Sequence, residues 1–469
     1  MKSILYVSDI VLFEFSRSSM VFPFFRSNQL TLKVPRAHPI RRGFRVNHKI
    51  NNGWPYDHIE HWPPMTYRDR ATPTSELLSD FANSLKKEGS SDQNRELQPW
   101  LPFCECKCAF CYFAVSCDKQ NVTSYITALK KSLSLYAEHN YIKSSVFTEL
   151  YVGGGSPSVI SAEQIADVLD FCRETFNLSS DHLTKFTACT NSLSEGKIST
   201  LRSNNVDQLD IGIQTFDNSL RKTLMIRDSN RDAKNKLRLI KKQGLRVSID
   251  LLYNLPGQTL DQWKDDINQA LELEVESVDC YPLDLYPETP LAKKIVAGEL
   301  SPVGDESKEL DMYLEAYKIF KENGYKPTCH NRFSRVKEDL NKPSSEIVGT
   351  GAGFFMGHID RFLYSDIDDI PSYISKVKEG SFPIARLNKI SKEDEMRKAM
   401  MLIYIRVPVD RENFRANFGR YPEEVFPNEI NKLKRDGLIE VREGQIQLTE
   451  KGDPWRFNIS WEFFKNVQN

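Results

Sequence analysis

The sequence predicts an α/β fold: a partial or complete (β/α) barrel with an N-terminal extension and a C-terminal helical, winged-helix-like domain. Between residues 98 and about 300, short apolar runs alternate with amphipathic helical stretches. Repeats of roughly 30–40 residues of this kind form βαβ units around a parallel sheet. At 469 residues the chain is too long for one ordinary core, so we expect more than one domain.

Four segments are expected along the chain. Residues 1–97 are an extension that ends in the polar linker 86–96, and residues 98–300 form the barrel core. A connector with a glycine-rich stretch, residues 301–390, completes the core, and residues 391–469 form the C-terminal domain.

Each strand candidate is an apolar run that ends in a turn signal, and a helical stretch with amphipathic spacing accompanies it. The expected strands are 147–152, 184–188, 208–213, 245–251 and 276–281. The expected helices are 121–140, 161–175, 194–204, 230–243, 260–274, 306–325 and 387–406, and 427–452 reads as helix, turn, strand, strand. Reactive groups of such a fold gather at the carboxyl ends of the strands.

Composition excludes several classes of protein. The net charge is −1, so no basic field favours nucleic acid. No stretch approaches about 20 uninterrupted apolar residues, so we expect no membrane span. The apolar start of the chain faintly resembles a signal peptide, but Asp9 and Glu14 interrupt it and no small-residue cleavage site follows. Nine cysteines are too few, and odd in number, for a disulfide framework, so we expect a cytoplasmic protein.

The segment PFCECKCAFCYF carries the strongest chemical signal. Cys104, Cys108 and Cys111 stand in the spacing C-x3-C-x2-C, with Cys106 as a spare thiol between them. Three thiolates can hold three irons of a [4Fe–4S] cluster and leave the fourth iron open to a reactant. A zinc site usually shows two paired cysteine or histidine knuckles, and only one group is present. The spacing therefore favours an iron–sulfur cluster.

Polar or small groups follow several of the expected strands. Residues 153–157, GGGSP, follow the first of them, and glycines there allow a ligand to approach the backbone. Gln214 ends another strand, and Asp250 lies near the end of the next. A carboxylate and an amide at the same barrel face as the cysteine loop indicate a ligand site.

These motifs together resemble the radical S-adenosylmethionine (SAM) superfamily. The narrower resemblance is to the oxygen-independent coproporphyrinogen III oxidase-like (HemN-like) group. It rests on the cysteine loop, GGGSP, IGIQTF, SIDLLYNLPGQT, LYPETPLAKKIVAGEL and, near the C-terminus, FGRYPEEVF and DGLIEVREGQIQLTEKG. It covers about residues 100–469.

The resemblance implies two cofactors. Cys104, Cys108 and Cys111 would bind a [4Fe–4S] cluster, and SAM would chelate its open iron, with room for a second SAM molecule. The SAM contacts implied by position are Gly154 for the first molecule and Gly155, Ser156, Gln214 and Asp250 for the second, with Phe110 nearby. Thr187 stands where the family has a glutamate, and Arg227 stands one position beyond the place of an expected arginine.

Within this group the sequence most resembles the class C radical SAM methyltransferases and the anaerobic haem-degradation methyltransferases. The expected reaction transfers a SAM-derived carbon, by methylation or cyclopropanation, to a tetrapyrrole, aromatic or alkene substrate. A flavodoxin or ferredoxin would supply electrons. The substrate-side candidates are Tyr253, Tyr281, Tyr286, His330, Phe354 and Phe355.

Two other functions fit the same motifs. One is a coproporphyrinogen III dehydrogenase-like oxidative decarboxylase, although the third cysteine is followed by Tyr-Phe where true oxidases have a further cysteine. The other is a haem-binding chaperone of the same group. In that case His330, His358 or Cys329 is a candidate axial ligand of the haem iron.

Overall fold

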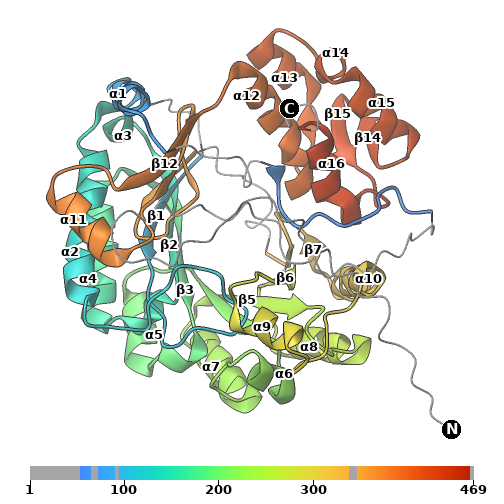
Figure 1. Ribbon diagram of the computed structural model, residues 1–469, viewed down its shortest axis with the longest axis horizontal. Helices are drawn as coiled ribbons and strands as arrows, with labels where there is room; N and C mark the ends of the chain where they lie inside the picture. The colour runs from blue at the N-terminus through green and yellow to red at the C-terminus, as the bar shows by residue number, and fades with distance from the viewer. Residues whose placement is uncertain (1–52, 65–71, 90–93, 337–345, 465–469) are drawn as a thin grey trace, which may run out of the picture.

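One large mixed sheet organises most of the molecule (Figure 1). The computed structural model describes residues 53–64, 72–89, 94–336 and 346–464. The basic and apolar stretches at the start of the chain lie outside these described residues. The sheet has twelve strands in the order β12-β11-β10-β9-β1-β2-β3-β4-β5-β6-β8-β7, and a separate three-stranded sheet lies in the C-terminal part.

The centre of the large sheet is parallel. Its strands follow one another in chain order: β1 (Arg95–Leu101), β2 (Phe147–Gly154), β3 (Leu178–Ala188), β4 (Gln208–Gln214), β5 (Arg246–Tyr253) and β6 (Ser277–Pro282). On the other side of β1, β9 (Glu346–Thr350) is also parallel. All of these strands therefore present their carboxyl ends at one rim.

Helices connect the parallel strands and lie on the outside of the sheet (Figure 1). They are α2 (Val122–Ala137), α3 (Asn140–Lys143), α4 (Ala162–Thr175), α5 (Glu195–Ser203), α6 (Asn218–Thr223), α7 (Asn230–Lys242) and α8 (Leu260–Glu272), with short 3-10 turns at Pro157–Val159 and Thr190–Ser192. Ser161 and Thr259 form capping boxes that fix where α4 and α8 begin. Each of these two helices buries one apolar face against the strands.

The sheet is open, so the alternative of a complete barrel is wrong and the partial barrel is confirmed. At one end β10 (Gly357–Ile359), β11 (Phe362–Asp366) and β12 (Ile384–Lys389) run antiparallel. At the other end lie β8 (Arg332–Ser334) and β7 (Lys326–Pro327), also antiparallel. Among the described residues β12 and β7 do not pair with each other. Two residues ending in a proline make β7 a poor template for a further strand.

Several elements differ from the sequence expectation. The N-terminal extension contains α1 (Ser75–Ser84), and β1 begins at Arg95, inside the expected linker. The expected helix 387–406 starts later, as α12 (Lys392–Met401) with a 3-10 turn at Leu402–Ile405, because the preceding residues pair with β11 as β12. The expected helix 306–325 is present as α10 (Glu306–Glu322), whereas α9 (Pro290–Val296) and α11 (Ile370–Lys378) lie where no helix was expected.

The C-terminal part has its own apolar core and lies at the upper right of Figure 1. It contains α13 (Arg411–Phe418), α14 (Pro422–Val425), α15 (Pro427–Arg435), a 3-10 turn at Asp453–Trp455, α16 (Arg456–Glu462) and the sheet β13 (Val409–Asp410), β15 (Gln445–Leu448), β14 (Ile439–Arg442). α15 followed by β14 and β15 gives the expected helix–strand–strand order. No helix in the described part of the chain is long and apolar enough to cross a membrane.

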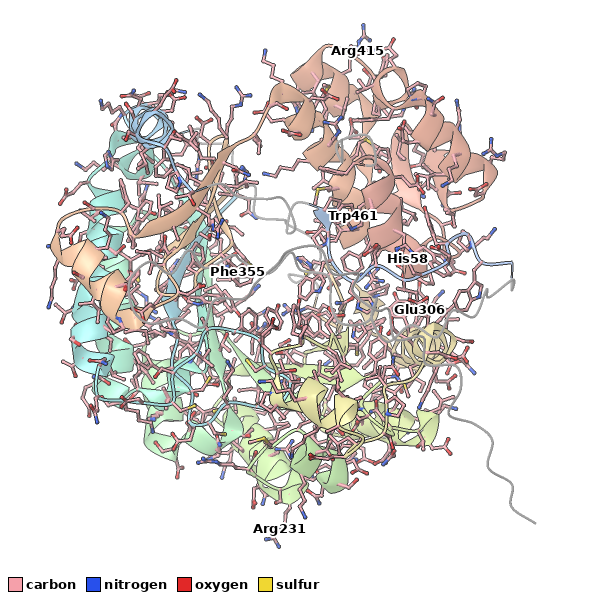
Figure 2. All side chains as sticks on the ribbon, in the orientation of Figure 1. His58, Arg231, Glu306, Phe355, Arg415 and Trp461 are labelled. Carbon is pink, nitrogen blue, oxygen red and sulfur yellow. The ribbon has the colours of Figure 1, made fainter. Side chains whose placement is uncertain are left out.

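A segment from the N-terminal extension binds the C-terminal part to the core. His61 is buried between the carboxylates of Asp284 (Nδ1–Oδ1 2.7 Å) and Glu309 (Nε2–Oε1 2.6 Å). In the same segment, the carbonyl of Trp62 accepts a hydrogen bond from the indole N–H of Trp461 (2.9 Å). Figure 2 labels Trp461 and, in the N-terminal segment, His58. Residues 54–62 thus contact α16, α10 and the loop after β6.

Candidate cluster and cofactor site

The cysteine loop lies at the carboxyl rim, directly after β1. Its backbone is fixed at both ends: Cys104 N–H donates to Ser116 O (2.9 Å) and Ser116 N–H donates to Pro102 O (2.7 Å). In the middle, Ala109 N–H donates to the carbonyl of Leu224, and Ala109 O accepts from Leu291 N–H, both at 2.9 Å. The loop is therefore held by α6 and α9 as well as by its own strand.

The three cysteines fit a cluster by their donor chemistry. Cys104, Cys108 and Cys111 are half-buried, and burial raises the pKa of Cys104 and of Cys108 to about 12 and raises that of Cys111. Thiolates at these positions therefore need a bound cation to stabilise them, as iron does.

No group of three or more His, Cys, Asp or Glu side chains among the described residues is arranged to hold one metal ion. In a [4Fe–4S] cluster each cysteine binds a different iron, so the three sulfurs need not converge on one point. A single zinc, with all its sulfur ligands about 2.3 Å from one ion, needs such convergence.

The GGGSP run lies against the cysteine loop. Gly154 adopts φ +124°, and a Cβ there would lie 2.3 Å from Leu101 O. A Cβ on Gly155 would lie 2.8 Å from Cys104 Sγ and 2.6 Å from Phe103 O. Ser156 N–H donates to Phe103 O (2.7 Å), and its hydroxyl accepts from Cys104 Sγ (3.8 Å). Only glycines allow β2 and the loop to approach this closely.

Asp250 lies on β5 with acidic neighbours. It is paired in register with Asp279 of β6, whose carboxylate binds Arg332 (2.8 Å). Asp250 has no hydrogen-bond partner among the described residues. Burial and then the charges of Asp279 and Asp210 raise its pKa well above the usual range. A cationic ligand such as a sulfonium or ammonium would relieve this repulsion.

The remaining candidate SAM contacts are spread along the same rim. Gln214 ends β4 at a bulge with φ +68°, and its side chain turns back over Gly212. Thr187 of β3 hydrogen-bonds the hydroxyl of Tyr151 (2.8 Å). Phe110 is half-buried among the leucines that lie near α9. Nothing but sequence position assigns these three residues to SAM.

Arg227 lies on the loop after α6 and is exposed. Its charge lowers the pKa of Glu105 and opposes the rise in the pKa of Cys106, so the guanidinium is near the cysteine loop. An arginine at this place can contact an anionic group bound beside the loop.

The sequence interpretation missed two further thiols. Cys189 follows β3, and its charge raises the pKa of Cys104, Cys106 and Cys108 after the larger effect of burial. Cys117 is exposed after the loop and acts on Cys104 in the same way. The position of Cys189 depends on β3 lying next to β2, which the spacing of cysteines does not show.

The substrate-side aromatic candidates divide by burial. Tyr253 packs on Trp263 in the core (5.3 Å between centroids), and Phe354 is fully buried. Phe355 is half-buried and lies on the inner side of the molecule (Figure 2). The structure therefore gives Tyr253 and Phe354 packing roles.

Comparison with known families agrees with this architecture. Residues 99–270 match the radical SAM superfamily, and residues 390–455 match the HemN C-terminal domain. The chain belongs to the HemN-like group of the radical SAM superfamily. Its cofactors are a [4Fe–4S] cluster and SAM.

Relatives cover most of the chain. A haem chaperone HemW of Bacillus subtilis is 27% identical over 75% of this chain and 94% of its own length. A HemW of Lactococcus lactis is 29% identical over 77% and 95%. An anaerobilin synthase of Escherichia coli O157:H7 is 23% identical over 84% and 89%. Coproporphyrinogen III oxidase (HemN) from Escherichia coli has the same fold, with a TM-score of 0.74, 18% identity and coverage of 87% of this chain and 100% of that one.

These relatives correct the expected function. The relatives that span the chain are named haem chaperones, an anaerobilin synthase and a coproporphyrinogen III oxidase. The expectation of a class C methyltransferase that transfers a SAM-derived carbon is therefore wrong. It depended on short motifs such as LYPETPLAKKIVAGEL.

Proposed function

We propose that this protein is a haem-binding chaperone of the HemN-like group, a radical SAM protein that holds haem for transfer to an acceptor protein. The observation that carries the proposal is the similarity to two proteins named haem chaperones over about three-quarters of this chain and nearly all of theirs. A chaperone of this kind needs a haem site that releases as well as binds.

His330 is the best supported axial ligand among the described residues. It lies in the turn between β7 and β8 with φ +50°, and the residue is exposed. Two buried arginines donate to its carbonyl, Arg406 Nη1 at 3.0 Å and Arg456 Nε at 3.1 Å. These bonds hold the strained backbone, and the ring lies edge-on to Tyr404 (5.2 Å between centroids, 69°).

The charge state of His330 also suits a ligand. Desolvation of the ring, and then the charges of Arg332, Arg456 and Arg406, lower the pKa of this histidine to about 4, although the residue as a whole is exposed. The imidazole is therefore neutral at pH 7, as coordination to iron requires. Cys329 precedes it in the same turn, whereas His358 lies on β10 near the far end of the sheet, 2.9 Å from the ammonium of Lys398. This supports His330 over His358.

A second candidate is an enzyme that acts on a tetrapyrrole, as the relatives named anaerobilin synthase and coproporphyrinogen III oxidase do. The observation in its favour is Asp250 on β5, whose carboxyl has no hydrogen-bond partner among the described residues and is suited to a cationic cofactor. When bound, the cluster and SAM supply an organic radical for hydrogen abstraction. A flavodoxin- or ferredoxin-type protein is the proposed electron donor for this activity.

Titration with haem tests the proposal. The protein is reconstituted with iron and sulfide under anaerobic conditions, and haem binding is followed by the Soret band. We expect saturation at one haem per chain. The Soret band should shift in His330→Ala and should keep its position in His358→Ala. Absence of haem binding, together with a SAM-derived product formed on an added tetrapyrrole, would favour the enzyme instead.

A further inference from the structure

Four aromatic rings form a continuous row beside the cysteine loop. Tyr286 follows β6, Tyr112 and Phe113 follow Cys111, and Phe355 follows β9. Neighbouring centroids along the row are 4.1, 4.6 and 5.8 Å apart, and the ring planes are inclined by 27°, 31° and 29°. The row therefore joins three parts of the carboxyl rim that are far apart in sequence.

Trp100 supports the row from behind. It is buried at the end of β1 and stands edge-on to Phe113 (6.4 Å, 72°) and to Phe355 (5.9 Å, 89°). Edge-to-face contacts of this kind are favourable and fix ring orientation. The row is thus anchored to the sheet, although Tyr112 and Phe113 belong to a loop.

Tyr112 carries the largest exposed part of the row. Tyr112 lies between Tyr286 and Phe113, so its faces are covered, yet 40% of the residue is exposed. Phe113 and Phe355 are half-buried. Edges of aromatic rings carry partial positive charge and attract the negative face of another π system. These partly exposed rings therefore suit the face of a flat conjugated molecule.

A cation lies at the same place. Lys107 is exposed on the cysteine loop, and its ammonium donates to the carbonyl of Phe113 (3.0 Å). If a bound molecule covers Phe113, an acidic substituent at its edge can pair with the ammonium of Lys107. An extended aromatic face with peripheral carboxylates is the chemistry of a tetrapyrrole.

We propose that the row Tyr286–Tyr112–Phe113–Phe355 is a platform on which the face of a tetrapyrrole lies, with a carboxylate of the macrocycle directed to Lys107. The inference rests on the proposed function for the class of ligand, and it adds a binding surface that requires no metal in the macrocycle. It also places the ligand next to Cys111. Binding at the platform differs from axial ligation by His330, which requires iron in the ring.

Metal-free protoporphyrin tests the platform. Its affinity is measured by absorbance and fluorescence for the full-length reconstituted protein, for Tyr112→Leu, for Phe355→Leu and for the double variant. Each substitution is expected to weaken binding by about 2–12-fold, the usual range for one aromatic contact. Phe418→Leu, in α13 and paired with Phe414 (4.7 Å), is the matched control and should bind porphyrin as the unmodified protein does. Iron content and circular dichroism verify that each variant is folded and loaded.

Three outcomes would overturn the inference. If haem binds but metal-free porphyrin does not, axial ligation alone holds the ligand and the platform is wrong while the proposed function stands. If the variants bind porphyrin as tightly as the unmodified protein but lose affinity for SAM, the row binds the adenine of SAM instead. If the unmodified protein binds neither haem nor porphyrin, the inference and the proposed function fail together.

Discussion

Substitution of Gly155 by alanine is the sharpest perturbation of the cluster site. The new methyl group would lie 2.6 Å from Phe103 O and 2.8 Å from Cys104 Sγ, both closer than real side chains come. The backbone oxygen cannot move without breaking the bond that it accepts from Ser156 N–H (2.7 Å), so we expect the loop to shift and to displace Cys104. Overpacking of this kind costs about 1–3 kcal/mol of folding stability, and disturbed support of a ligand weakens metal binding by about 10–100-fold.

The assay compares cluster retention with global stability. Iron and sulfide per chain are measured after anaerobic reconstitution, the rate of iron loss to a chelator is followed, and thermal unfolding is recorded by circular dichroism. Gly196→Ala is the matched control, because its Cβ would meet only Ser194 Oγ at 3.9 Å, and alanine in this helix should stabilise by about 0.5–1 kcal/mol. Iron content and release rate in Gly155→Ala equal to those of the unmodified protein would refute the close approach between β2 and the cysteine loop.

Three further predictions concern single side chains. Burial raises the pKa of Asp366 to about 7, so its contribution to stability is present at low pH and is lost as pH rises from about 4 to 7. In Asp366→Asn, the free energy of unfolding in urea should therefore depend less steeply on pH over that range, by up to about 1.4 kcal/mol per pH unit. Asp453→Ala leaves a buried arginine without its carboxylate and should cost about 3–5 kcal/mol in denaturant unfolding, whereas Glu450→Ala, in an exposed pair, should cost less than about 1 kcal/mol. Cys106→Ser should keep the iron content of the unmodified protein and Cys108→Ser should not; the reverse result would change the ligand set.

Much of the central sheet can be predicted from sequence because its strands are apolar runs followed by amphipathic helices. The expected strand 208–213 and helix 260–274 lie within a residue or two of β4 and α8. Local patterns contain this information, since capping residues such as Thr259 and buried periodic side chains act over a few residues.

The predictions that failed concern features that depend on contacts between distant segments. The apolar pattern of 387–406 fits a helix, but the residues just before α12 form an edge strand because β11 is available to pair with them. Whether the sheet closes into a barrel depends on the strands that pair at its two edges, and the repeated strand–helix pattern does not show this pairing. His61 between two carboxylates and Cys189 near the loop likewise depend on tertiary packing.

The cluster ligands could be predicted from the sequence, but the function could not. The spacing of Cys104, Cys108 and Cys111 reflects ligand chemistry that is local to one loop. The choice among carbon transfer, oxidation and haem binding depends on what lies over the rim, where residues that follow β6 and β9 contact the cysteine loop. Those residues are scattered along the chain, and the short motifs of the core are shared by proteins with different activities.

The central claim is that three cysteines hold a [4Fe–4S] cluster with one iron open to SAM. Electron paramagnetic resonance of the reduced, reconstituted protein with and without SAM tests it most directly. We expect the signal of a reduced [4Fe–4S] cluster that changes when SAM is added, because SAM then binds the open iron. A cluster signal that SAM leaves unchanged, or reconstituted protein with no such cluster, would contradict the claim.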